Sequence, residues 1–153
     1  MAMNINIDSF KDNGWHWKTE YGYPQDDFYT NKNTRFYQCV DQAPESIIQY
    51  AEETFLHHTL TMMKQPPGSF IPNHTDKYYL FKKKYDIKSE QQIVRYCVFL
   101  EDWQPGHYFE VEGKPLLNWQ SGDVCVLEKD VPHRSANAGM NYKYTAQITG
   151  VLK

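Results

Sequence analysis

The sequence contains no apolar run long enough to span a bilayer, and its N-terminus lacks the basic segment followed by an apolar one that marks an export signal. Positive charge is not in excess either, since 16 Lys and Arg residues stand against 19 Asp and Glu residues. A nucleic acid or an anionic membrane is normally held by a basic face, so neither is expected as a partner. The only basic run, Lys82 to Lys84, is expected to be a solvated loop or strand end. Together these absences predict a cytoplasmic protein.

Cysteine is scarce and irregularly spaced. None of Cys39, Cys97 and Cys125 belongs to a C-x-x-C pair, and two of them lie in apolar, strand-like runs where a thiol packs as a small hydrophobe. The chain also has no repeat of solenoid length, no low-complexity tract and no Gly/Ser linker. The cysteine pattern therefore predicts a reducing compartment. The length of 153 residues and the absence of a linker predict one domain, with an N-terminal wrap and helix over about residues 1–57 and a core over about 58–152.

The remaining pattern is that of a mainly β protein. One helix is expected over roughly Pro44 to Phe55, where proline suits the first turn and Ile47, Ile48 and Ala51 fall on one face. After it come about eight short extended runs separated by turn signals, which favours an antiparallel jelly roll braced by one or two N-terminal helices. The first 40 residues do not decide between helix and strand, and we expect them to wrap the sheet.

The stretch "FIPNHTDK" carries the first candidate functional residues. In an extended chain residues i and i+2 point to the same face, so His74 and Asp76 can present a nitrogen and an oxygen to one point. A third ligand would complete the two-histidine, one-carboxylate triad that leaves open positions on non-haem Fe(II). The candidate is His133, several strands later, which a jelly roll can bring beside an early strand.

The other histidines suit this cluster less well. His57 and His58 are expected at the end of the helix, His16 lies between two tryptophans in the undecided N-terminal region, and His107 follows a turn. A structural or surface role is expected for each of them.

The last predicted strand, "NYKYTAQIT", places a lysine on its more polar face. Alternation puts Tyr142, Tyr144, Ala146 and Ile148 on one face, and Lys143, Thr145, Gln147 and Thr149 on the other. If the first face packs outward, Lys143 points into the barrel and needs an anionic partner, from the protein or from a ligand. The alternative is an amphipathic edge strand with Lys143 in water.

Taken together, these motifs resemble the Fe(II)- and 2-oxoglutarate-dependent dioxygenases, and among them the prolyl 4-hydroxylase branch. The resemblance rests on His74-x-Asp76, on Gly122-Asp123 before a hydrophobic strand, on His133, and on Lys143 ten positions later. The segment "VFLEDWQPGHYFEV" is also similar to that branch, except that His107 stands where a second glycine is usual. The resemblance covers roughly residues 59–152.

The resemblance implies a double-stranded β-helix fold and a set of roles. His74, Asp76 and His133 would bind Fe(II) and be the catalytic residues, and Lys143 would pair with the distal carboxylate of 2-oxoglutarate. Gln65 lies roughly where relatives place a tyrosine that hydrogen-bonds this cosubstrate, and Arg95 is a further inward polar candidate for cosubstrate binding.

The implied reaction uses O2 to hydroxylate an unactivated C–H bond, with succinate and CO2 as co-products. The expected substrate is a prolyl or other amino-acid residue, free or in a peptide. Trp103, Tyr108 and Trp119 could line the entrance to the site, although core or surface packing explains each of them as well. The carboxylate ligand Asp76 disfavours halogenation, since related halogenases have a small residue there.

Two other functions remain open from the sequence. One is a cupin-like metal-binding jelly roll that acts as a lyase, isomerase or sensor without 2-oxoglutarate. The other is a catalytically silent binding module that has kept the fold. Lys143 favours the dioxygenase over the cupin, because a cupin-type site has no need of a cation placed to receive a dicarboxylate.

Overall fold

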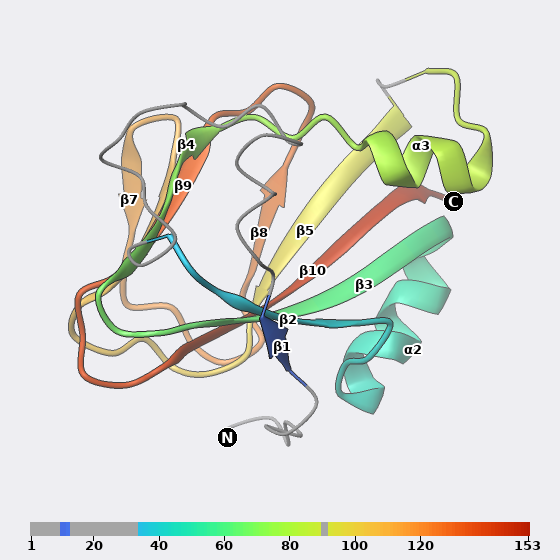
Figure 1. Ribbon diagram of the computed structural model, residues 1–153. Helices are drawn as coiled ribbons and strands as arrows, with labels where there is room; N and C mark the ends of the chain where they lie inside the picture. The colour runs from blue at the N-terminus through green and yellow to red at the C-terminus, as the bar shows by residue number, and fades with distance from the viewer. Residues whose placement is uncertain (1–9, 13–33, 90–91) are drawn as a thin grey trace.

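Two antiparallel sheets form the body of the protein (Figure 1). The computed structural model describes residues 10–12, 34–89 and 92–153. The larger sheet has the order β1 (Lys11–Asp12), β2 (Tyr37–Val40), β3 (Phe55–Gln65), β10 (Lys143–Leu152), β5 (Ile93–Phe99), β8 (Val124–Leu127). The smaller sheet has the order β4 (Ser69–His74), β9 (His133–Asn137), β6 (His107–Val111), β7 (Lys114–Leu116).

From β3 onward, the chain passes repeatedly from one sheet to the other. β3, β5, β8 and β10 belong to the larger sheet, whereas β4, β6, β7 and β9 belong to the smaller one. Early and late strands therefore become neighbours, with β3 beside β10 and β4 beside β9. This is the strand order of a double-stranded β-helix, or jelly roll, so the predicted fold is confirmed.

Helix α2 (Glu45–Thr54) braces the outer face of the larger sheet, as Figure 1 shows. Ile47 and Ala51 are buried in one cluster with Ala146 and Ile148 of β10. The helix was expected to reach Phe55, but Phe55 begins β3 and its ring is 2% exposed. His57 and His58 consequently lie within β3 and not at the end of a helix, and the His57 ring stacks on Tyr85 with the ring centroids 4.8 Å apart.

A second helix, α3 (Tyr79–Tyr85), contains the run Lys82 to Lys84. The expectation of a loop or strand end was therefore wrong. One face of this short helix is anchored by Phe81, which packs with Tyr78 and Ile93 in a buried cluster. A seven-residue segment has too few turns for its periodicity to stand out in the sequence.

The N-terminal part of the chain adds strands to the edge of the larger sheet. β2 pairs antiparallel with β3, and β1 pairs with β2. The rest of the expected wrap, including His16, lies outside the described residues. Within the described ranges, no helix has the length and apolar character needed to cross a membrane.

Candidate metal centre

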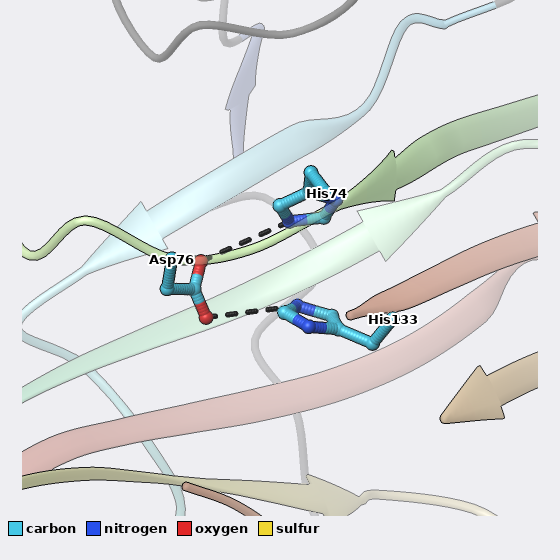
Figure 2. A group of neighbouring side chains, drawn as sticks. All are labelled: His74, Asp76 and His133. Atoms are coloured by element: carbon cyan, nitrogen blue, oxygen red, sulfur yellow. Dashed lines mark ion pairs between the residues drawn. The ribbon is translucent and has the colours of Figure 1, made fainter. Parts of the chain in front are cut away.

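Three candidate ligands from distant parts of the sequence meet between β4 and β9 (Figure 2). His74 ends β4, His133 begins β9, and the register of the two strands sets them opposite each other. Asp76 follows His74 by two residues, and its carboxylate lies 3.8 Å from His74 Nε2 and 3.6 Å from His133 Nε2. One ligand atom from each residue can be chosen so that all lie within 4.8 Å of one another. A single ion could therefore contact all three.

Backbone carbonyls orient both imidazoles. His74 Nδ1 lies 2.7 Å from the carbonyl oxygen of Pro72, and His133 Nδ1 lies 3.0 Å from that of Val131. A carbonyl oxygen can only accept a hydrogen bond, so each Nδ1 carries the proton and each Nε2 carries the lone pair. This outer hydrogen bond is the usual support of a metal-ligating histidine.

The charges of the cluster also suit a divalent cation. Burial lowers the pKa of His74 to about 4 and also lowers that of His133, so both rings are neutral at pH 7. Burial alone would raise the pKa of Asp76, but the positive charge of Arg95 holds it below its usual range. Metal binding requires this state, with neutral imidazoles and an ionised carboxylate.

One buried atom of the cluster has no hydrogen-bond partner. Asp76 Oδ2 is inaccessible to solvent and accepts no hydrogen bond within the described structure. A buried carboxylate oxygen without a donor is costly, and a cation between the three side chains would satisfy it. Two imidazole nitrogens and one carboxylate oxygen suit a divalent transition metal such as Fe(II). The residues thus fit the metal that the sequence predicted.

Lys143 lies inside the protein, on the first residue of β10. It is 2% exposed, and its Nζ donates to the Tyr108 carbonyl oxygen at 2.7 Å and to Ser135 Oγ. The rings of Phe109 and Trp119 lie 5.4 and 5.7 Å from Nζ. The alternative of an edge strand with this lysine in water is excluded by its burial. No carboxylate of the described chain lies within ion-pair distance of Lys143, and burial lowers its pKa to about 7.

Gln65 and Ser135 connect the lysine to the cavity wall. Ser135 Oγ donates to Gln65 Oε1 at 2.8 Å, and Gln65 Nε2 donates to the Ser69 carbonyl oxygen at 3.2 Å. Both side chains line the cavity described below, whereas Lys143 lies directly behind them. Ser135 was not predicted as a site residue, although it lies two residues after His133 and therefore on the same face of β9.

Arg95 lies beside the candidate metal ligands and not beside Lys143. Its Nη1 is 2.8 Å from Asp76 Oδ1, and its Nε donates to Thr149 Oγ1 at 2.9 Å. The structure therefore gathers four of the six predicted site residues at one place, His74, Asp76, Arg95 and His133, and the other two, Gln65 and Lys143, at a second place.

A cavity of about 550 Å³ opens onto the triad. Its floor is the inner face of β3 and β10, with Thr59, Thr61, Thr145, Gln147 and Thr149. Residues of β2 and α3 form other parts of its wall. The predicted inward face of the last strand is therefore confirmed.

The aromatic residues suggested for the entrance do not line this cavity. Trp119 is 6% exposed and stacks on Phe99 with the ring centroids 4.1 Å apart, and Trp103 donates from its ring nitrogen to the His107 carbonyl oxygen. Tyr108 donates from its hydroxyl to Glu110. These three belong to packing around β6, which is the alternative that the sequence left open for them. His107 is 1% exposed and also lies apart from the triad, so its structural role is as expected.

Neither a protein-family model nor a curated protein matches the sequence. Solved structures do match the fold. A prolyl-4-hydroxylase from Pseudomonas putida aligns with a TM-score of 0.56 at 17% identity, over 81% of this chain and 75% of that chain. A predicted oxalate decarboxylase from Thermotoga maritima gives 0.48 at 17% identity, over 77% and 82%. A double-stranded β-helix protein from Klebsiella pneumoniae gives 0.49 at 10% identity, over 80% and 81%.

At these identities the likeness concerns the fold alone. The first alignment supports the double-stranded β-helix that the strand order already defines. The protein therefore has a double-stranded β-helix fold, with a His–Asp–His cluster that could hold a metal ion.

Proposed function

We propose that the protein is an Fe(II)- and 2-oxoglutarate-dependent oxygenase that hydroxylates an unactivated C–H bond. His74, Asp76 and His133 would hold the iron, for which their geometry and charge state are suitable. The bound metal would supply the oxidising power by activating O2 at the expense of 2-oxoglutarate, with succinate and CO2 as co-products. A prolyl or other amino-acid residue, free or in a peptide, is the substrate class that the sequence resemblance implies.

The observation that carries this proposal is the buried amine of Lys143, which contacts Ser135 on the strand that His133 begins. Lys143 has no carboxylate partner in the described chain, and a dicarboxylate ligand would provide one. Ser135, which accepts the lysine's hydrogen bond, follows His133 by two residues on one face of β9. Two residues of a strand span about 6.7 Å, which is comparable to the length of a five-carbon dicarboxylate. A ligand reaching from the triad to the lysine is therefore sterically reasonable.

The chain's own residues would then have distinct tasks. Lys143 would neutralise the far carboxylate, while Ser135 and Gln65 would donate or accept hydrogen bonds beside it after exchanging their present partners. The threonine-rich floor of the cavity would hold the substrate near the open coordination positions.

The test is an anaerobic titration of the apoprotein with Fe(II) and then with 2-oxoglutarate. Chelation of iron by 2-oxoglutarate gives a visible charge-transfer band, which we expect in the wild type at one equivalent of iron. Lys143→Met should need a much higher 2-oxoglutarate concentration, because the amine that would pair with the distal carboxylate is missing. His133→Ala should give no band, and Lys83→Met, an exposed lysine of α3, should behave as the wild type.

A second candidate function is metal-dependent chemistry without 2-oxoglutarate, as a lyase, isomerase or sensor. It is favoured by a specific observation: Lys143 already has two hydrogen-bond acceptors and lies behind the cavity lining. One iron bound without a band on addition of 2-oxoglutarate would select this second function. No iron bound at all would contradict both functions and favour a catalytically silent module.

A further inference from the structure

The two oxygens of the Asp76 carboxylate have different surroundings. Oδ1 lies 2.8 Å from the Nη1 of Arg95, which is the distance of a charge-assisted hydrogen bond. Oδ2 is buried, has no hydrogen-bond donor in the described structure, and lies 3.6 Å from His133 Nε2 (Figure 2). Oδ1, which also lies 3.8 Å from His74 Nε2, is thus already paired with Arg95, whereas Oδ2 has no donor from the described protein.

The guanidinium of Arg95 is itself fixed from two other directions. Thr149 lies opposite Arg95 in the β5–β10 register, and its hydroxyl accepts a hydrogen bond from Arg95 Nε at 2.9 Å. The Tyr78 ring lies under the guanidinium, with 5.2 Å from its centroid to Cζ. Tyr78 is 8% exposed and has a left-handed backbone with φ of 56°, a conformation that a tyrosine adopts only where packing enforces it.

We infer that Arg95 is a positioning residue that holds Asp76 by Oδ1, so that the carboxylate offers the metal only Oδ2. A carboxylate without such a partner can ligate through both oxygens. A six-coordinate metal that is held by one atom from each of three protein ligands keeps three coordination positions for water, cosubstrate and O2. If Asp76 ligated through both oxygens, only two positions would remain. The inference rests on the metal site of the proposed function, but not on 2-oxoglutarate.

Affinity alone does not test this role. Loss of the guanidinium removes its repulsion of a divalent cation, which favours binding, and also removes the orientation of Asp76, which disfavours binding. The number of water molecules on the bound ion has no such ambiguity. It can be measured with Mn(II) in place of Fe(II), because each water on this paramagnetic ion contributes to the relaxation rate of the solvent protons.

The experiment compares the water-proton relaxivity per bound Mn(II) in four proteins without cosubstrate. We expect Arg95→Met to lower it by about one third, as three bound waters become two. Arg95→Lys keeps a cation beside Oδ1 and should restore most of the wild-type value. Arg134→Met is the matched control, since Arg134 also lines the cavity and pairs with Glu110 at the same distance of 2.8 Å, but does not contact a ligand.

The outcomes separate this inference from the proposed function. Equal relaxivity in the wild type and Arg95→Met would overturn the positioning role, as would an equal loss in Arg134→Met. A wild type that binds no Mn(II) or Fe(II) would contradict the metal site itself. If Arg95→Met does not fold, Thr149→Val removes only the hydroxyl that holds Arg95 Nε and should lower the relaxivity in the same direction. In that case, a relaxivity of folded Thr149→Val equal to that of the wild type would contradict the inference.

Discussion

Lys143 is the residue on which the two candidate functions differ most. A charged ammonium in an apolar interior is costly unless an anion compensates it, and its two acceptors here are a carbonyl and a hydroxyl. Two titratable groups favour its charged form, Cys97 and Glu101. Burial raises the pKa of the Cys97 thiol to about 12, so this group is neutral at pH 7, and Glu101 forms no ion pair with the lysine in the described structure. The amine therefore titrates near neutrality in the folded protein.

This shift makes stability depend on pH in a defined direction. Burial lowers the pKa of Lys143 to about 7, whereas an unfolded lysine has a pKa of about 10.4. Between these values the unfolded chain binds more protons, so the free energy of unfolding should rise with pH by up to about 1.4 kcal/mol per pH unit. Urea denaturation at pH 7, 8 and 9 should show this rise in the wild type and not in Lys143→Met. Parallel pH dependence in the two proteins would contradict the burial of an ionisable amine.

Binding of 2-oxoglutarate should take up a proton at the same residue. At pH 8 Lys143 is mostly neutral before binding, and a carboxylate beside it would favour the ammonium, so uptake should approach about one proton per site. At pH 6 the amine is already charged and uptake should be small. Calorimetric titration of the iron-loaded protein in two buffers with different ionisation enthalpies measures this number. Uptake of the same size in Lys143→Met would assign the proton to another group.

At the scale of elements, the junction between α2 and β3 depends on a glycine in β10. A Cβ at Gly150 would lie 2.4 Å from a ring carbon of Phe55 and 2.6 Å from the His57 carbonyl oxygen. The clash with backbone cannot be relieved by a side-chain rotation. Gly150→Ala should therefore destabilise the protein by about 1–3 kcal/mol, the usual cost of overpacking.

The effect of Gly150→Ala can be measured by urea denaturation. Gly113→Ala is a useful comparison, because Gly113 has φ of 77° but no neighbouring atom within 4 Å of the position that an added Cβ would take. Only the strain of a left-handed backbone, about 1–2 kcal/mol, therefore applies at Gly113. A smaller loss in Gly150→Ala than in Gly113→Ala would contradict the close approach of Phe55.

The elements differ in how well the sequence predicted them. Alternation over the eight residues from Tyr142 to Thr149 made the two faces of β10 predictable, and the apolar spacing did the same for α2. The i, i+2 rule placed His74 and Asp76 together, because it depends only on local geometry. Helix α3 was missed, since its position is decided by the packing of Phe81 against Ile93 from another strand.

The direction of the Arg95 side chain could not be predicted from the local sequence pattern either. A long flexible side chain on the inner face of β5 can reach either end of the cavity, and the choice depends on Asp76 and Thr149, which come from distant parts of the sequence. For the same reason the sequence could suggest a lysine inside the barrel without showing that Ser135 and the Tyr108 carbonyl would satisfy it.

At the scale of the whole molecule, the site is assembled because the chain passes repeatedly between the two sheets. His74 and His133 belong to strands that are remote in sequence and adjacent in the smaller sheet, so a bound metal would join β4, the segment after it and β9. The unfolded chain does not hold these ligands together. Binding of a metal at this site would therefore be linked to folding.

Mn(II) should consequently stabilise the protein against urea. At a free concentration about 100 times Kd, a ligand that binds only the folded state adds about 2.7 kcal/mol to the free energy of unfolding. The gain should vanish on addition of EDTA and in His133→Ala, which keeps only two of the three ligands, while Arg134→Met should retain it. Because the comparison is made within each variant, with and without Mn(II), any loss of packing at residue 133 cancels. An equal gain in His133→Ala would show that the ion binds elsewhere, and the link between this fold and its candidate metal centre would have to be abandoned.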